Sequence, residues 1–192
     1  MNLYLMGDSI LDNKTYTGSG TSTMDVIAGA APDDWNVQPL AVDGATINST
    51  GNQRHPDEGL RVISMGGNDL LPFVTELAED EDKPVNYIAS LLPIRNQFEE
   101  EYRAVLGDTP KVLTLVMTIW RPRFGEPTLD AACDMVVGCF NATIWKLAQQ
   151  TGADVFDLHG KAEPSWHANP IEPSDHGSKE IAAAVMRWAT QQ

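Results

Sequence analysis

Hydrophobic and β-branched residues gather in five short runs, separated by longer segments in which apolar residues recur every three or four positions. The runs are Leu3–Met6, Val37–Val42, Leu60–Met65, Val112–Met117 and Val155–Leu158. Short apolar runs that alternate with helical periodicity are typical of a parallel sheet covered by helices. The pattern therefore predicts an α/β fold with a five-stranded parallel sheet.

Helices are expected in the segments around these strands. They cover Ser22–Ala30, Leu70–Ala78, Val85–Leu106, Leu129–Gln150 and a C-terminal stretch from about Gly177 to Gln191. The C-terminal helix has an apolar stripe that is expected to face the sheet, formed by Ile181, Ala184, Val185 and Trp188. Ser174 precedes this helix and is a candidate N-cap.

The composition is that of one soluble globular domain spanning residues 1–192, with 42% hydrophobic and 21% charged residues. Thirteen Lys and Arg against 27 Asp and Glu give a net charge of -14, and such a surface repels phosphate, so nucleic acid is not expected as a partner. No apolar stretch is long enough for a membrane span or a signal peptide. We therefore expect a cytoplasmic protein without a membrane partner.

Two other features have simple structural interpretations. Cys133 and Cys139 share one predicted helix, where a spacing of six residues puts them on different faces, so two reduced, buried thiols are expected rather than a bridge. The polar stretch Gly51–Gly59, with His55, and the acidic run Glu79–Asp82 are predicted to be solvated loops.

Residues that can carry chemistry follow three of the predicted strands, where a parallel sheet places its ligand crevice. Ser9 follows the first strand in the turn Gly7–Ile10 and is the candidate nucleophile. Gly44 follows the second strand and supplies a main-chain N–H. Asn68 follows the third strand in Gly66–Asp69 and supplies an amide donor for an oxyanion. The three strand ends together offer one hydroxyl and two hydrogen-bond donors.

The chain resembles the SGNH, or GDSL, hydrolases over nearly its whole length. The turn Gly7-Asp8-Ser9-Ile10 resembles the first block of that family, Gly44 the second, and Gly66-Gly67-Asn68-Asp69 the third. The resemblance implies a flavodoxin-like three-layer α/β/α sandwich with Ser9 as nucleophile. It also implies an oxyanion hole formed by the N–H groups of Ser9 and Gly44 and the amide of Asn68, with Asp8 and Asp69 holding the turns.

The fourth block departs from the family pattern. Family members usually carry Asp-x-x-His-Pro, followed by a glycine five residues after the histidine. Aligning Pro173 and Gly177 to that pattern puts Asn169 at the aspartate position and Glu172 at the histidine position. The usual histidine and aspartate of the triad are therefore missing.

Three interpretations of this departure remain open. Glu172 is the base for Ser9, which requires burial to raise the pKa of its carboxyl group. Alternatively His176, about one helical turn further on, is the base, although the adjacent Asp175 points away and is not expected to orient its ring. In the third interpretation Ser9 is not activated, and the chain is a catalytically silent domain that binds a ligand or a partner.

The loop after the fourth predicted strand is expected to overhang the crevice. In it, Trp120 and Phe124 are candidates for the walls of an acyl or sugar pocket. Arg121 is a candidate for holding a substrate carboxylate, or else pairs with a nearby surface acid. His159 and His167 could also reach the site, and His167 is the second candidate to test as a base.

The sequence lacks a Gly-x-Ser-x-Gly elbow around Ser9, a phosphate-binding P-loop and a His-Glu-x-x-His zinc motif. The resemblance implies a serine hydrolase, an esterase that cleaves a small acyl ester or an acetylated carbohydrate through an acyl-enzyme on Ser9. No cofactor and no metal are implied. The alternative is the silent binding domain.

Overall fold

A computed structural model describes residues 1–53, 56, 58–79, 84–107 and 112–192. Its centre is a five-stranded sheet with the order β2-β1-β3-β4-β5, in which each neighbouring pair is parallel. The strands are β1 (Asn2–Gly7), β2 (Asn36–Pro39), β3 (Gly59–Ser64), β4 (Val112–Met117) and β5 (Asp154–Phe156). This is the strand order of flavodoxin-like folds, whose ligand crevice opens between β1 and β3.

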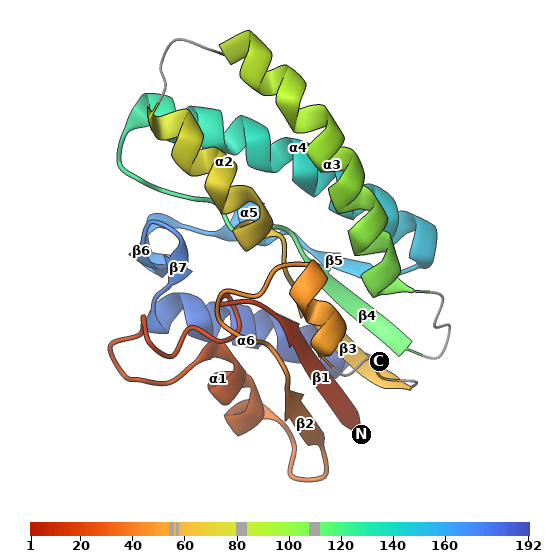
Figure 1. Cartoon of the computed structure of the whole chain (residues 1–192). Helices are drawn as coiled ribbons and strands as arrows, with labels where there is room; N and C mark the ends of the chain where they lie inside the picture. Colours follow the sequence, from red (N-terminus) through yellow and green to blue (C-terminus); the bar gives the residue numbers. More distant parts are fainter. Residues whose placement is uncertain (54–55, 57, 80–83, 108–111) are drawn as a thin grey trace.

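Helices cover both faces of the sheet (Figure 1). On one face lie α1 (Thr23–Ala30) and α6 (Asp175–Ala189), which contact each other. On the other lie α2 (Gly67–Glu79), α3 (Pro84–Leu106) and α4 (Pro127–Thr151). The predicted three-layer α/β/α sandwich with a parallel sheet is confirmed.

The sheet separates two hydrophobic cores because successive strand residues point to opposite faces. Leu5 and Val62 belong to the core under α1 and α6, whereas Ile63 belongs to the core under α2, α3 and α4. In the second core the ring of Phe140 meets that of Phe98 edge-on, at 5.0 Å between centroids. Each such fully buried side chain contributes about 1.5–3 kcal/mol of burial free energy.

The helix starts follow the capping residues of the sequence. Ser22 caps α1 in a capping box with Asp25, and Ser174 caps α6 by accepting a hydrogen bond from the N–H of Gly177. Helix α6 buries Ile181 and Val185, as the stripe predicted, although it begins and ends two residues earlier than expected.

The strand ends differ from the predictions in two places. Strand β2 ends at Pro39 rather than at Val42, although the N–H groups of Leu40 and Val42 still donate to main-chain oxygens of β1, at 2.9 and 3.0 Å. Strand β5 ends at Phe156, since Asp157 caps the short helix α5 (Leu158–Lys161). Here the apolar Leu158 begins a helical turn instead of closing the strand.

The segment between α5 and α6 contains structure that the pattern did not predict. After the 3-10 turn η2 (Pro164–Trp166), strands β6 (His167–Asn169) and β7 (Glu172–Pro173) form an antiparallel hairpin. These strands are too short for a period of two to be recognised in the sequence. A second 3-10 turn, η1 (Asn48–Asn52), precedes β3.

Three further predictions have different outcomes. Cys133 is buried, but Cys139 is exposed, because six residues along α4 turn the side chain to the outer face; both are free thiols. The prediction of two buried thiols was therefore wrong for Cys139.

His55 and most of the acidic run, residues 80–82, lie outside the described residues. Over the part of the chain that is described, no helix combines the length and the apolar character needed to cross a membrane.

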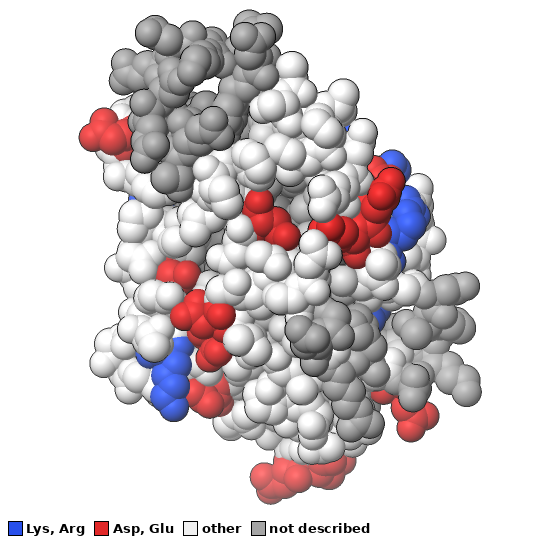
Figure 2. Space-filling model, in the orientation of Figure 1, with Lys and Arg blue, Asp and Glu red and all other residues white. Residues whose placement is uncertain are grey.

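The negative charge of the chain is visible on its surface. Figure 2 shows acidic side chains in several clusters over one face, with basic side chains in few places. A surface of this sign attracts cations and repels polyanions.

Candidate active site

Ser9 stands at the end of β1 in a tightly held turn. Gly7 has a φ of 137°, and a Cβ there would lie 1.8 Å from the main-chain oxygen of Ser64 on β3, so only glycine fits. The carboxyl group of Asp8 accepts hydrogen bonds from the N–H of Ile10 at 3.1 Å and from the hydroxyl of Ser64 at 3.2 Å. Asp8 thus holds the turn, as the resemblance implied.

Glu172 meets this turn from β7, which lies 163 residues further along the chain. The hydroxyl of Ser9 donates a hydrogen bond to Oε1 of Glu172 at 2.9 Å, and Glu172 is only 4% exposed. Burial raises the pKa of Glu172 to about 7; the Ser9 hydrogen bond opposes this rise, and the nearby carboxylates of Asp8 and Asp43 add to it. At neutral pH the group is therefore close to its midpoint, which suits a general base.

Asn68 lies in the first turn of α2, one residue after the helix begins at Gly67. The sequence placed it before the helix, so the helix start was predicted three residues too late. The Asn68 amide donates to the main-chain oxygen of Ala45 at 2.9 Å, and an amide has a second N–H to offer.

Gly44 lies in the turn held by the amide of Asn68. The N–H of Ala45 donates to Val42 at 3.0 Å, and Gly44 has a φ of 76°. In the part of the chain that is described, the N–H groups of Ser9 and Gly44 donate to no protein acceptor. Gly44 itself does not line the pocket beside Ser9.

Asp69 fixes the same turn from α2. Both of its carboxylate oxygens accept from the N–H of Ile47, at 3.2 and 3.1 Å. Burial raises the pKa of Asp69, and these hydrogen bonds oppose the rise. Its role is the structural one that the resemblance implied.

A partly open pocket lies beside Ser9 and Glu172. Its wall is mostly apolar, and its polar residues are Asp8, Ser9, Ser64, Asn68 and Glu172. The lining residues are Asp8, Ser9, Ile10, Ser64, Met65, Gly67, Asn68, Leu70, Leu71, Ile119, Trp120, Pro122, Val137, Ile171 and Glu172. Such a wall suits a small uncharged group. Apart from Trp120, the apolar members were not singled out in the sequence, because nothing in their spacing distinguishes a pocket wall from a core.

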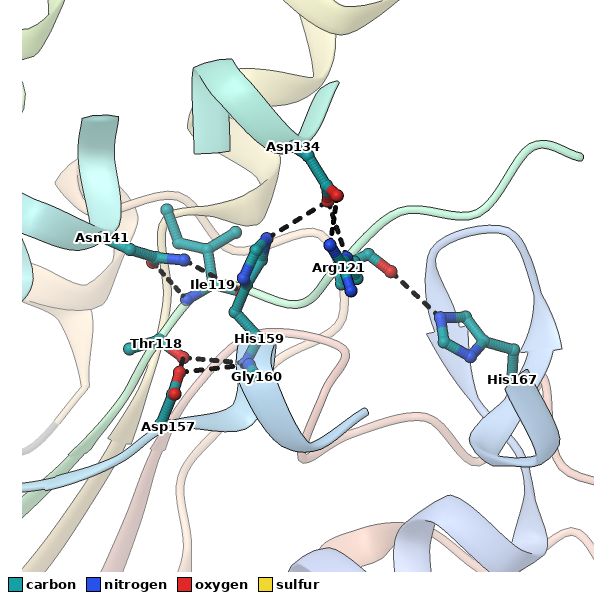
Figure 3. Close-up of polar contacts among 9 residues, drawn as sticks. All are labelled: Thr118, Ile119, Arg121, Asp134, Asn141, Asp157, His159, Gly160 and His167. Atoms are coloured by element: carbon teal, nitrogen blue, oxygen red, sulfur yellow. Dashed lines mark hydrogen bonds and ion pairs between the residues drawn. The ribbon is translucent and has the colours of Figure 1, made fainter. Parts of the chain in front are cut away.

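Of the three residues in the loop after β4 that were predicted to contact the substrate, one lines the pocket. Trp120 lines the pocket and is 3% exposed. Arg121 makes a bidentate ion pair with Asp134 of α4 and does not line the pocket (Figure 3). Phe124 is 36% exposed and lies outside the pocket wall as well. The alternative interpretation of Arg121, a pair with a nearby acid, is the one that the structure shows.

Two histidines lie beside this loop, outside the pocket wall. Nε2 of His159 lies 3.4 Å from Oδ1 of Asp134, and burial lowers the pKa of His159 (Figure 3). His167 faces the main-chain oxygens of Glu163 and Arg121 with its two ring nitrogens, both at 3.0 Å. Its ring lies 4.6 Å from that of Trp120. Neither histidine lines the pocket.

His176 is exposed in the first turn of α6 and does not line the pocket. Asp175 beside it binds the segment around Ser19, accepting hydrogen bonds from that residue and from the N–H of Gly18. As predicted, this carboxylate does not orient the ring of His176. Of the two candidate bases in this segment, Glu172 is the one in contact with Ser9.

Within the described residues, no group of three or more His, Cys, Asp and Glu side chains is arranged to hold a metal ion. The groups that meet at Ser9 are its hydroxyl, a carboxyl group of raised pKa and nearby N–H donors. This combination suits acyl transfer.

Comparisons with known proteins identify the fold. No protein-family model matches the chain, and neither does any curated protein sequence. Among solved structures, an extracellular lipase from Streptomyces rimosus matches with a TM-score of 0.71 and 18% identity, covering 98% of this chain and 99% of the lipase. A GDSL-like lipase from Parabacteroides merdae matches with a TM-score of 0.73 and 16% identity, covering 100% and 96%.

An acetylxylan esterase from Geobacillus stearothermophilus, solved as a catalytic mutant, matches with a TM-score of 0.65 and 17% identity, covering 97% of this chain and 92% of the esterase. These matches extend over nearly the full length of both chains. The chain therefore has the fold of the SGNH, or GDSL, hydrolases.

Proposed function

We propose that this chain is a serine ester hydrolase in which Ser9 is the nucleophile and Glu172 is the general base. The observation that carries the proposal is the 2.9 Å hydrogen bond from the Ser9 hydroxyl to the buried Glu172 carboxylate, at the edge of a largely apolar pocket. A nucleophile in contact with a base of raised pKa supports an active enzyme over a silent binding domain.

In the first step Ser9 Oγ attacks the ester carbonyl carbon, and its proton passes to Oε1 of Glu172. The protonated Glu172 is neutral, and its burial favours that form. When the tetrahedral intermediate collapses, the bond to the alcohol breaks and Glu172 returns the proton to the departing oxygen. Water then attacks the acyl-Ser9 ester by the same sequence, and the acid is released.

The negative charge on the carbonyl oxygen needs donors fixed before the reaction begins. The proposed donors are the N–H groups of Ser9 and Gly44 and the second N–H of the Asn68 amide. The hydrogen bond from Asn68 to Ala45, next to Gly44, supports their action as one group. Removal of one such donor typically costs 10²- to 10³-fold in kcat, as an order of magnitude.

The proposed substrate is a small acyl ester or an acetylated carbohydrate. The apolar wall and the indole of Trp120 suit a short acyl group. None of the described residues that line the pocket is Lys, Arg or His, and the guanidinium of Arg121 is bound to Asp134, so we expect the site to favour uncharged acyl groups over those with a carboxylate.

The test is the hydrolysis of short-chain p-nitrophenyl esters by the wild type and by three variants. Ser9→Ala is expected to abolish turnover, and Glu172→Gln to lower kcat by about 10²- to 10⁴-fold. His176→Ala is the matched control four residues away and is expected to stay within about twofold of the wild type. A loss of activity in His176→Ala with none in Glu172→Gln would assign the base to the histidine.

A pH profile alone does not separate these two bases. The pKa of Glu172, at about 7, falls close to that of an ordinary imidazole. The variants therefore decide the assignment.

A further inference from the structure

The proposed base lacks the carboxylate that orients the base of a Ser-His-Asp triad. Asn169 occupies that position in the sequence, but its side-chain oxygen accepts from the N–H of Ile171 at 2.9 Å and so closes the hairpin turn. Oε1 of Glu172 accepts from Ser9, whereas Oε2 is buried and has no partner among the described residues. Among those residues, no hydrogen bond to Oε2 fixes the direction of the carboxylate, so its position depends on the main chain of β7.

The main chain of β7 is held from the side of the nucleophile. Strand β7 is only two residues long, and the main-chain oxygen of Pro173 accepts a hydrogen bond from Nδ2 of Asn13 at 3.0 Å. Asn13 lies four residues after Ser9, in a turn closed by the N–H groups of Leu11 and Asp12 on the oxygen of Asp8. One short segment thus carries the nucleophile and binds Pro173, the residue that follows Glu172.

The Asn13 amide is fully used and fully buried. Nδ2 also donates to the hydroxyl of Ser178 at 2.8 Å, and Oδ1 accepts from the N–H of Thr23 at 2.8 Å and from its hydroxyl at 3.2 Å. The N–H of Thr23 can only donate and the oxygen of Pro173 can only accept, so the orientation of the amide is determined. Aspartate lacks the donor for Pro173, and serine is too short to reach both sides.

We propose that Asn13 is the positioning residue of the site, holding β7 at the distance and angle that keep the Glu172 carboxylate on the Ser9 hydroxyl. Asn13 thus has the orienting role of the missing triad aspartate, but it acts on the main chain of β7 and not on the base itself. The kinetic part of this inference rests on the proposed ester hydrolysis, while the geometric part does not.

The decisive variant is Asn13→Asp, which keeps the shape and the acceptor for Thr23 but removes the N–H that binds Pro173. We expect kcat to fall by about 10- to 100-fold while KM stays within about threefold, because a displaced catalytic group slows the reaction without removing the pocket. Ser178→Ala is the matched control. It removes the other acceptor of the same amide, leaves the bond to Pro173, and should keep kcat within about threefold of the wild type.

A crystal structure of each protein supplies a readout that does not depend on turnover. In Asn13→Asp the Glu172 carboxylate is expected beyond hydrogen-bond distance of Ser9 Oγ, whereas in the wild type and in Ser178→Ala it stays on the hydroxyl. If Asn13→Asp does not fold, Asn13→Ser provides the same test, since its hydroxyl does not reach Pro173.

The acid limb of the pH–rate profile gives a second kinetic readout. The Ser9 hydrogen bond lowers the pKa of Glu172, so its loss in Asn13→Ser, which adds no charge beside Glu172, should move the limb to higher pH. A general loosening of the fold would expose Glu172 to solvent and move the limb to lower pH.

The results separate the positioning role from the proposed function. An unchanged Ser9–Glu172 contact in both Asn13 variants, or an equal fall of kcat in Asn13→Asp and Ser178→Ala, would overturn the role of Asn13. A wild type that hydrolyses no ester would overturn the proposed function, and the crystal structures would still decide whether Asn13 holds the pair together.

Discussion

Replacing Glu172 by glutamine keeps the shape of the side chain and removes its charge. The difference in free energy of unfolding between the variant and the wild type therefore measures by how much the buried carboxylate destabilises the fold. Burial raises the pKa of this group from 4.5 to about 7. A carboxyl group with a higher pKa in the folded state stabilises the fold fully below its unfolded pKa, and this stability is lost as the pH rises through the folded pKa.

The size of the effect follows from the shift. At about 1.36 kcal/mol per pKa unit, the wild type loses about 3 kcal/mol from this group by pH 8 but only about 1 kcal/mol by pH 5. Glutamine does not titrate. The advantage of Glu172→Gln over the wild type should therefore grow by about 2–3 kcal/mol between pH 5 and pH 8.

Urea unfolding followed by tryptophan fluorescence at the two pH values measures this difference. Any hydrogen bond that the amide makes or loses contributes at both pH values and cancels when they are compared. Glu163→Gln is the control, because Glu163 is exposed and its replacement should have the same effect at both pH values. If the advantage of Glu172→Gln does not grow with pH, burial does not raise the pKa of Glu172. The physical reason for assigning Glu172 as the base is then removed.

The other predictions concern the rate and the packing. The kcat/KM for p-nitrophenyl acetate, followed in a pH-stat, should rise about tenfold from pH 6 to pH 8 as Glu172 ionises, and a flat profile would contradict this. Gly7→Ala should prevent folding, because its Cβ would lie 1.8 Å from an oxygen of β3, while Gly20→Ala, in open space at a φ of 68°, should cost about 1 kcal/mol in urea unfolding. Phe140→Ala should cost about 3–5 kcal/mol and Trp145→Ala, 47% exposed, less than about 1 kcal/mol; similar values would show that the core under α4 is loosely packed.

The layers of the fold could be predicted from the sequence because they depend on local periodicity. Strand β4 has the predicted bounds, and α1 covers the predicted segment except for its first residue, Ser22, which caps the helix. Predictions were less accurate where a polar residue interrupts an apolar run. Asp157 caps a helix and so ends β5 early, and Asn68 falls inside α2.

The candidate site was only partly accessible to sequence reasoning. Ser9, Asn68 and Trp120 lie together at the pocket because strand ends of a parallel sheet meet at one edge. Arg121 and Phe124 follow Trp120 directly but do not line the pocket, since neighbouring residues of an extended loop point in different directions. Asn13 was missed, because its partners Pro173 and Thr23 are found only in the folded chain.

The sequence by itself determined the succession of strands and helices along the chain, the turn that carries Ser9 and the absence of the usual histidine from the last block. It left Glu172 and His176 as rival bases, since both lie within one helical turn and either could reach Ser9. Only the tertiary structure shows which of them lies against Ser9: the hairpin of β6 and β7 buries Glu172 against the end of β1, while the first turn of α6 leaves His176 exposed. Burial, which gives the carboxylate a pKa of about 7, depends on residues more than 160 positions away, and no local pattern contains that information.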